Sequence, residues 1–383
     1  MKIALVTHNV VRGNGQGRVN YELVRYCRSV GIGVNMICEQ LAPEVLDTGA
    51  IWNRLGLWIN RPDLLHGMHF TPRANKLVRQ LRGQVDLVVA NGAVLAEPHA
   101  VNICHFVHGA WSRSSMHDSK TKRGPAAWYH AVYAKCNVRW ERQAFDAAQT
   151  IVGVSAQVRE ELIGIGIDDA KVRVIVNGVD LAEFHPGEES REKLGLPAAG
   201  PLALFVGSIR TPRKNLDGVL RAVQKIPQMQ LAVVGDEAQS PFPAMARKMG
   251  LADRVRFLGF RRDVPKLMRA CDMFVFPSRY EACSLALLEA LASGLPVISA
   301  KTAGGSELIS PECGHVLADP EDLNGLVGAI TRFLDGDVRA KAKIAARAVA
   351  EEHGWSHMGR QYVELFEEHL RKHKPRVPAG ASA

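Results

Sequence analysis

Apolar runs that are typical of buried strands alternate with amphipathic runs that are typical of helices along most of this 383-residue chain. Strands that are joined through helices run parallel, because each helix returns the chain to the edge from which the previous strand began. The alternation therefore predicts open parallel sheets with helices on both faces. It stops at residues 177–189, which read as a turn and a polar connector, and restarts at Leu202. We therefore predict two α/β domains, each with its own core.

The predicted elements follow from the period of the apolar residues. In the first half, strands are predicted at Ile3–Thr7, Val34–Cys38, Leu87–Ala90, Ile103–Val107, Ile151–Val154 and Val172–Val176, and helices at Arg18–Ser29, Ala126–Ala147 and Ala156–Ile163. In the second half, strands are predicted at Leu202–Val206, Leu231–Val234, Val255–Leu258, Met273–Phe276 and Val297–Ser299.

Two carboxylates stand close to the strand predicted at Met273–Phe276. Glu281 lies in the loop after this strand, and Ser284 is placed to cap the helix that follows. Within that helix Glu289 falls on the apolar stripe, where an unsatisfied carboxylate would cost several kcal/mol. The two hydroxyl groups of a nucleotide ribose could satisfy it, and the helix N-terminus before it suits a phosphate. The alternative is a core helix with one glutamate paired to a neighbouring arginine.

Three cations follow the first strand of the second half. Arg210, Arg213 and Lys214 come shortly after Gly207, beside a predicted helix start. Such a loop suits a nucleoside diphosphate, whose developing charge has to be neutralised when a glycosidic bond breaks. The alternative is an ordinary solvated basic loop.

A glycine-rich loop, residues 13–18, joins the first predicted strand to the first helix. Its glycines allow backbone amides to approach a ligand closely, although the loop could also be a plain tight turn. Glu39 ends the next strand, where a dinucleotide fold places an acid that binds a ribose, so an NAD-type dehydrogenase is one hypothesis. The dinucleotide pattern requires a glycine where Arg18 stands, which disfavours this hypothesis.

Residues 101–111 end a first-half strand in a His-Gly turn. Polar residues at the carboxyl end of a parallel strand face the ligand crevice, which makes His108 a candidate site residue. His105 lies three residues earlier, inside the predicted strand and on its opposite face. We therefore predict that His105 is a packed core residue.

The segment from Arg279 to Ile298, which contains Glu281 and Glu289, resembles the two-glutamate signature of retaining glycosyltransferases with the GT-B fold, in particular family 4 (glycosyl transferases group 1). Residues 177–186 are similar to the interdomain segment of these enzymes, and residues 355–370 to their final helix. The resemblance implies two Rossmann-like domains facing a cleft. The implied parts are an acceptor-side domain at 1–180, a linker at 181–200, a nucleotide-sugar-binding domain at 201–354, a helix at 355–373 that crosses back to the first domain, and a disordered tail at 374–383.

The resemblance also implies roles for individual residues. Glu281 would hold hydroxyl groups of the donor sugar, and Glu289 would hold the ribose. Lys214 and one arginine would bind the diphosphate, and we favour Arg210 because it lies four residues before the lysine. His108 would lie beside the donor sugar. The remaining contacts would be made to the donor by Gly15, Gln16, Gly17, Gly207, Arg213, Cys283, Ser284 and Leu285, and to the base by Leu258, Gly259 and Phe260.

By this resemblance the chain would move a hexosyl group from a nucleotide sugar, with UDP- or GDP-linked sugars favoured. The acceptor would be a glycan, a lipid-linked glycan or a small molecule in cell-envelope or polysaccharide biosynthesis. The family's reaction is a front-face substitution in which the leaving phosphate takes the acceptor's proton, and it implies no metal and no other cofactor. The Asp-x-Asp at residues 335–337 reads as a turn and helix cap. A nucleotide-sugar 2-epimerase of the same fold and a non-catalytic nucleotide-sugar-binding subunit are the alternatives.

The net charge of +9 is concentrated in the first part of the chain, which favours contact with an anionic membrane or a phosphorylated acceptor over nucleic acid, because no nucleic-acid-binding module accompanies it. An ordinary solvated basic face is the alternative. Trp52 and Trp58 lie in a segment, 41–85, that we expect to hold acceptor-side loops or a short amphipathic element. The sequence has seven cysteines without a Cys-x-x-Cys pair, and it has no signal-peptide pattern and no long apolar run. These features predict a cytoplasmic protein, and peripheral contact with the inner membrane face is a further hypothesis. The basic residues are Arg54, Arg61, Arg73, Lys76, Arg79, Arg82, Arg113, Lys120, Lys122, Arg123, Lys135, Arg139 and Arg142.

Overall fold

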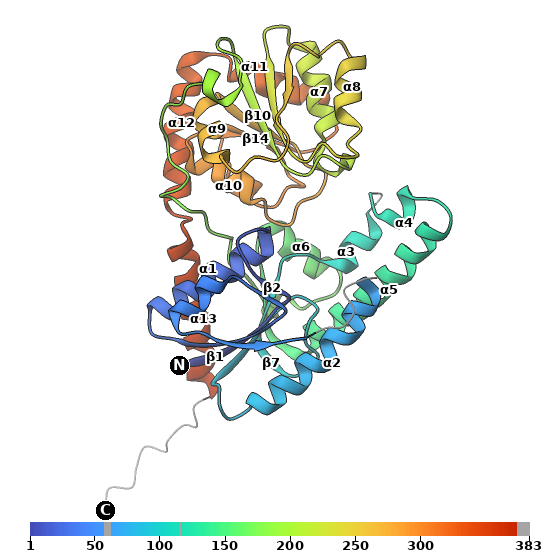
Figure 1. Ribbon diagram of the computed structural model, residues 1–383, viewed down its shortest axis with the longest axis vertical. Helices are drawn as coiled ribbons and strands as arrows, with labels where there is room; N and C mark the ends of the chain where they lie inside the picture. Colours follow the sequence, from blue (N-terminus) through green and yellow to red (C-terminus); the bar gives the residue numbers. More distant parts are fainter. Residues whose placement is uncertain (57–62, 115, 374–383) are drawn as a thin grey trace, which may run out of the picture. The chain divides into compact units, whose positions relative to one another are not determined.

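The computed structural model describes residues 1–56, 63–114 and 116–373 (Figure 1). Their contacts divide the chain into two compact units, of which the first comprises residues 1–153, 161–175 and the chain from Ser356, and the second comprises residues 154–160 and 176–355. Residues 154–160, which we had placed in the first domain, therefore belong to the second unit. Trp58, Arg61 and the predicted tail at 374–383 lie outside the described residues.

The first unit is built on a seven-stranded parallel sheet, as the alternating pattern predicts. Its strands, in spatial order, are β5 (Ile51–Arg54), β3 (Gly33–Cys38), β1 (Lys2–Val6), β6 (Leu87–Asn91), β7 (His99–Cys104), β8 (Ala148–Gly153) and β9 (Val172–Val174). A small parallel pair, β2 (Asn9–Val10) and β4 (Gln40–Leu41), lies outside this sheet. The helices are α1 (Gly15–Ser29), α2 (Asp63–Leu81), α3 (His108–Arg113), α4 (Asp118–Thr121), α5 (Pro125–Ala147) and α13 (Trp355–His373), and α6 (Ala156–Gly164) belongs to both units.

The second unit is built on a six-stranded parallel sheet. Its strands, in spatial order, are β12 (Val255–Phe257), β11 (Gln230–Val234), β10 (Leu202–Val206), β13 (Met273–Phe276), β14 (Val297–Ala300) and β15 (Gly314–Leu317). Its helices are α7 (Leu216–Lys225), α8 (Phe242–Lys248), α9 (Val264–Ala270), α10 (Leu285–Ala292), α11 (Leu323–Arg332) and α12 (Gly336–Glu351). Helix α7 packs with α8 and α11, whereas α10 packs with α12, and Figure 1 shows β10 and β14 between the two groups. Both faces of the parallel sheet are thus covered, which explains its uninterrupted apolar strands.

The strand that we predicted at 103–107 is wrong by about four residues, since β7 ends at Cys104. Its earlier part was missed because two buried polar side chains, His99 and Asn102, interrupt the apolar run. The amide of Asn102 lies 3.1 Å from the Nε2 atom of His99 and donates to the carbonyl of Gly92, also at 3.1 Å. These contacts offset part of the cost of burying the two side chains, so the polar residues are compatible with a central strand.

Gly304 connects β14 to the loop that contains Glu281. Its amide donates to the carbonyl of Glu281 at 2.7 Å, and its own carbonyl accepts from the amide of Ser284 at 3.0 Å. A Cβ atom on Gly304 would lie 1.8 Å from the carbonyl oxygen of Ala282, so only glycine permits this close approach.

We expect Gly304→Ala to lower the free energy of unfolding by about 1–3 kcal/mol or more, because the new methyl group overlaps backbone that cannot rotate away. Gly328→Ala is the matched control, because Gly328 lies in the exposed middle of α11 with no atom near its Cβ position. It should raise the free energy of unfolding by about 0.5–1 kcal/mol. Denaturant unfolding of both variants measures the difference. Equal stabilities would contradict the close packing of Gly304.

Candidate active site

The structure brings Lys214 and Glu281 together at one edge of the second sheet. Lys214 ends the short 3-10 turn that follows β10, and Glu281 lies in the loop after β13, the neighbouring parallel strand. The Nζ atom of Lys214 lies 2.6 Å from Oε2 of Glu281, and both side chains are largely buried, at 13% and 19% exposure. Both loops follow the carboxyl ends of adjacent parallel strands, which is where ligands bind in open α/β sheets.

Lys214 lies in an environment that opposes its charge. Burial lowers the pKa of Lys214, and the charge of Arg213 lowers it further, whereas Glu281 raises it. The ammonium group also lies 4.8 Å from the ring centroid of Phe276, the last residue of β13. A Cβ atom on Gly207 would lie 2.7 Å from Cδ of Lys214, so glycine at this position leaves room for the lysine side chain. An anion is therefore a favourable additional partner for this ammonium group.

The arginine that shares this site is Arg213. Its Nη1 atom lies 3.4 Å from Oε2 of Glu281 and donates to the carbonyl of Tyr280 at 3.0 Å. Arg210, which we had favoured, pairs instead with Asp236, and about half of its side chain is exposed. The structure therefore groups Arg213, not Arg210, with Lys214 and Glu281.

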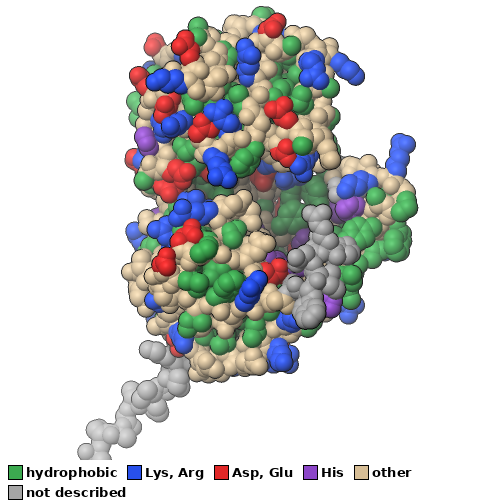
Figure 2. All heavy atoms as spheres, viewed as in Figure 1, with side chains coloured by type: hydrophobic (Ala, Val, Ile, Leu, Met, Phe, Trp, Pro, Cys, Tyr) green, Lys and Arg blue, Asp and Glu red, His purple; other side chains and the backbone are tan. Residues whose placement is uncertain are grey.

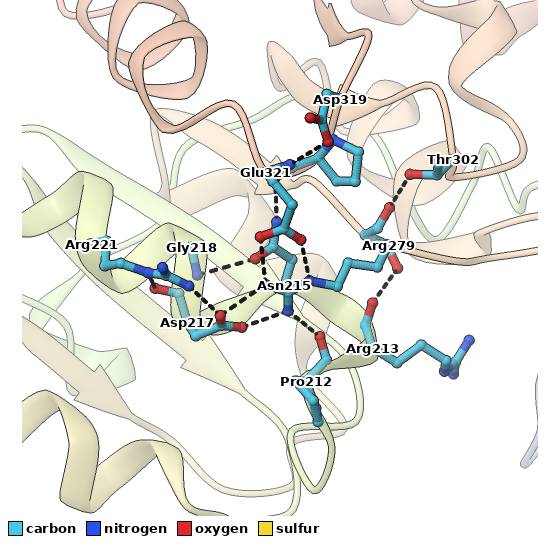
Figure 3. A network of polar contacts seen from close by, with 12 residues as sticks. Pro212, Arg213, Asn215, Asp217, Gly218, Arg221, Arg279, Thr302, Asp319 and Glu321 are labelled. Atoms are coloured by element: carbon cyan, nitrogen blue, oxygen red, sulfur yellow. Dashed lines mark hydrogen bonds and ion pairs between the residues drawn. The ribbon is translucent and has the colours of Figure 1, made fainter. Parts of the chain in front are cut away.

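Arg279 holds the loop of Arg213 and Lys214 in place (Figure 3). It donates to both carboxylate oxygens of Asp217 at 2.7 and 2.8 Å, to the carboxylate of Glu321, and to the carbonyl of Pro212 at 2.5 Å. Its backbone amide donates to the carbonyl of Arg213 at 2.9 Å. Burial opposes the charge of Asp217, but the hydrogen bond and charge of Arg279 outweigh it and lower the pKa of that carboxyl.

Asn215 completes the same network. It adopts a left-handed backbone conformation, with φ of 60°, which asparagine tolerates better than most residues. Its side chain accepts from the amide of Gly218 at 3.1 Å, which caps α7, and donates to the carbonyl of Pro320 at 2.6 Å. Sequence reasoning missed Arg279, Asp217 and Asn215 as positioning residues, although Arg279 begins the segment that carried the family resemblance.

Helix α10 begins as predicted, with Ser284 as its N-cap accepting from the amide of Leu287. Glu289 is half-buried on this helix, also as predicted, and Leu285 is its first residue. Burial raises the pKa of the Cys283 thiol to about 12, so this side chain stays protonated at neutral pH and is a poor nucleophile. The candidate base residues follow β12, where Leu258 and Gly259 are half-buried and Phe260 is 77% exposed.

In the first unit, a cavity of about 520 Å³ is lined by Gln16, Asn91, His105, His108 and Glu141, among others. The side-chain amide of Gln16 donates to Oδ1 of Asn91 at 2.6 Å, and Asn91 donates in turn to the buried Asn20 at 2.5 Å. One wall of the cavity is therefore polar and held by hydrogen bonds.

The other glycine-loop residues form the start of α1. Gly15 is its first residue, and the amide of Gly17 donates to the Asn14 side chain at 2.5 Å. A Cβ atom on Gly17 would lie 2.7 Å from the Asn14 oxygen, so this glycine is needed for the helix cap itself. Arg18 pairs with Glu22 at 2.9 Å, one turn along α1.

Glu141 was missed by the sequence analysis. Its carboxylate, from α5, accepts from the backbone amides of His108 at 2.6 Å and Gly109 at 2.9 Å, which are the first two residues of α3. Burial raises its pKa to about 7, and the two backbone hydrogen bonds only partly offset this. Burial, with a smaller contribution from the charge of His117, lowers the pKa of His108 to about 4, so this imidazole is neutral near pH 7.

Our prediction for His105 was wrong. Because β7 ends at Cys104, strand alternation no longer applies to His105, and its side chain lines the same cavity as His108. Burial lowers the pKa of His105 to about 4, and its Nε2 atom is buried without a hydrogen-bond partner among the described residues.

Glu307 and Glu39 serve other contacts. The carboxylate of Glu307 accepts from the amides of Ala156 at 2.8 Å and Gly305 at 2.7 Å. Glu39, the residue that suggested a dinucleotide fold, lies 2.8 Å from Nε2 of His66.

Comparisons with known families identify both halves of the chain. The Glycosyltransferase Family 4 model matches residues 13–183, and the model of Glycosyl transferases group 1 matches residues 187–349. The chain therefore belongs to the glycosyltransferases of family 4 and group 1, and this membership replaces the hypothesis of an NAD-type dehydrogenase.

Curated relatives carry the name D-inositol 3-phosphate glycosyltransferase. The protein of this name from Mycobacterium marinum is 32% identical over 222 residues, which cover 55% of this chain and 47% of that protein. The relative from Catenulispora acidiphila is 32% identical over 237 residues, which cover 56% of this chain and 55% of that protein. The chain thus spans about half the length of the curated relatives that it matches.

Solved structures share the GT-B fold over nearly the whole chain. The sucrose-phosphate synthase of Thermosynechococcus elongatus has a TM-score of 0.79 at 21% identity, with 97% of this chain and 99% of that chain covered. WaaG, a glycosyltransferase involved in lipopolysaccharide biosynthesis, has a TM-score of 0.73 at 19% identity, with 95% of this chain and 99% of that chain covered. Anabaena HepE, solved in complex with UDP-glucose, has a TM-score of 0.71 at 21% identity, with 96% of this chain and 100% of that chain covered.

Glu141 should make the stability of the first unit depend on pH. A carboxyl whose pKa rises from 4.5 to about 7 on folding stabilises the fold fully below pH 4.5, and this contribution is lost as the pH rises through 7. Relative to Glu141→Gln, the free energy of unfolding of the wild type should therefore fall by up to about 3 kcal/mol between pH 4.5 and 8.

Chemical unfolding across this pH range, with both proteins measured side by side, tests the expectation. Glu367→Gln, at an exposed position of α13, is the control and should follow the wild type. A constant difference between the wild type and Glu141→Gln would show that Glu141 does not titrate in this window.

Proposed function

We propose that this chain is a retaining glycosyltransferase that moves a hexosyl group from a nucleoside diphosphate sugar to an acceptor hydroxyl group. The observation that carries the proposal is the buried contact of Lys214 and Arg213 with Glu281 at the carboxyl edge of the second sheet. Cations at this position suit a diphosphate, and a carboxylate beside them suits the hydroxyl groups of the attached sugar.

The electrostatics of the site fit stabilisation of a leaving group. Without a ligand, Glu281 partly neutralises Lys214 and Arg213. A bound diphosphate would take over these cations, and they would then stabilise the negative charge that develops as the glycosidic bond breaks. Glu281, held by two cations, fits a binding role better than attack on the anomeric carbon. We therefore propose a front-face substitution, in which the leaving phosphate accepts the proton of the attacking hydroxyl group.

Similarity guides the choice of substrates. Anabaena HepE, which shares the fold, has been solved with UDP and glucose and with UDP-glucose, and this supports a uridine nucleotide as the donor, with GDP as the alternative. The relatives act, by their names, on a phosphorylated polyol or in lipopolysaccharide biosynthesis. We propose a glycan, a lipid-linked glycan or a small polyol as the acceptor, in cell-envelope or polysaccharide biosynthesis in the cytoplasm. The cationic cradle supports chemistry without a metal, so activity should persist in a chelator.

Lys214→Ala and Glu281→Gln should each lower the turnover of a UDP-sugar by about 100-fold or more, because each removes a charge that acts on the donor. Lys248→Ala, on the exposed surface of α8, is the matched control and should retain wild-type turnover. Product analysis by nuclear magnetic resonance should show an anomeric configuration that matches the donor.

Circular dichroism should confirm that the variants are folded. Wild-type turnover in folded Lys214→Ala would refute the assignment of the cradle. Release of a 2-epimerised sugar nucleotide, in place of a glycoside, would favour the epimerase alternative.

We also propose that α4 and the start of α5 contact an anionic membrane surface. Asp118 is the only acid between Glu97 and Glu141, and Lys120, Lys122 and Arg123 are exposed there. Trp128 follows them with 71% of its surface exposed, and Figure 2 shows Lys and Arg side chains on this part of the surface. A tryptophan beside a cationic cluster suits the interface of an anionic bilayer. None of the described helices is long and apolar enough to cross a membrane.

The chain should therefore sediment with phosphatidylglycerol vesicles but much less with phosphatidylcholine vesicles, and high salt should release it. Trp128→Ala and Arg123→Glu should each weaken sedimentation, whereas Lys248→Ala should not. Equal sedimentation of all four proteins would contradict the proposed surface.

A further inference from the structure

Three potential metal ligands converge in the first unit, outside the donor site. His8 follows β1, Glu39 follows the neighbouring strand β3, and His66 lies on α2. One ligand atom from each lies within 4.8 Å of the others, and the three are half-buried. Two imidazoles with one carboxylate form a ligand set that binds Zn²⁺ in many proteins.

The spacing of these atoms is close to that of a coordination sphere. Nε2 of His66 lies 2.8 Å from Oε1 of Glu39, and Nδ1 of His8 lies 3.6 Å from the same oxygen. A tetrahedral ion with bonds of about 2.0–2.1 Å places its ligand atoms roughly 3.3 Å apart. Both distances to Glu39 lie within about half an ångström of this value, so side-chain rotation could bring the ligand atoms onto one ion.

The ordinary contacts of the cluster leave one of its atoms poorly satisfied. Nδ1 of His8 is shielded from solvent and has no hydrogen bond of good geometry among the described residues, because Oε1 of Glu39 lies 3.6 Å away. His66 contacts both oxygens of Glu39, at 2.8 and 3.0 Å. A buried polar atom without a hydrogen bond is costly, and a metal ion would satisfy Nδ1 of His8.

The backbone and one aromatic ring hold the ligands in position. The amides of Glu39 and Gln40 both donate to the carbonyl of His8, at 3.0 and 3.3 Å, so the two strand ends are tied together. The ring of His8 packs on Phe70 with 4.2 Å between centroids, and Phe70 lies one turn after His66 on α2. The ligand set is thus largely preorganised.

The cluster opens onto the cavity of about 520 Å³ described above, which leaves space for an exchangeable fourth ligand. We propose that His8, Glu39 and His66 bind a divalent transition metal ion of the Zn²⁺ type. Nitrogen ligands make Mg²⁺ and Ca²⁺ poor candidates, because these ions prefer oxygen. This site is separate from the donor chemistry of the second unit, which we propose to be metal-independent, and its test does not depend on turnover.

Isothermal titration of chelator-treated, full-length protein with Zn²⁺ tests the site directly. The wild type should bind one equivalent more tightly than any surface site, and Co²⁺ in its place should give the visible absorption of a tetrahedral complex. His66→Ala and the isosteric Glu39→Gln should weaken this binding by more than the roughly 10- to 100-fold that changes outside the ligand sphere cost.

His69→Ala is the matched control, because His69 is exposed on the same helix and should leave binding unchanged. Circular dichroism of the metal-free proteins should confirm that every variant is folded. Failure of the wild type to bind Zn²⁺, or equal binding by folded Glu39→Gln, would overturn the proposal.

Discussion

The guanidinium group of Arg279 fixes the geometry on which the proposed donor site depends. It connects the loop after β13 to the loop after β10 through Asp217 and Pro212, and to a third segment through Glu321. A planar group with five donors can hold several acceptors in fixed directions, which a lysine could not do. The positions of Lys214 and Glu281 therefore follow from an arginine that contacts neither of them in the network described.

The charges of the site compensate one another before any substrate binds. Burial favours loss of the proton from Lys214, and Glu281, which lies 2.6 Å away, opposes this effect. A donor bound as we propose would compete with an internal carboxylate for the same cations. This competition favours a diphosphate over a ligand with a single charge, because the diphosphate offers more negative charge and more oxygens to Lys214 and Arg213.

Much of the fold was predictable from the sequence, because the period of the apolar residues and the order of strands and helices along the chain determine it. The alternation predicted both parallel sheets, and the sequence placed Lys214 and Glu281 in loops that follow strands of the second half. That these two strands are neighbours, so that the side chains meet, was seen only in the structure. The choice between Arg210 and Arg213 was not predictable, since it depends on side-chain directions after a single 3-10 turn. Glu141 could not be found either, because it acts on His108 from 33 residues away, through a helix packing that no local pattern encodes.

The start of α3 depends on Glu141, a side chain of another helix, α5, that accepts hydrogen bonds from its first two amides. A helix of six residues is too short to persist by itself, and its first amides are satisfied by a side chain from another helix. The backbone of His108 therefore depends for its native conformation on the packing of α5 against α3. Damage to α5, even where the side chain of His108 is untouched, would reach this end of the cavity before the sheet itself unfolds.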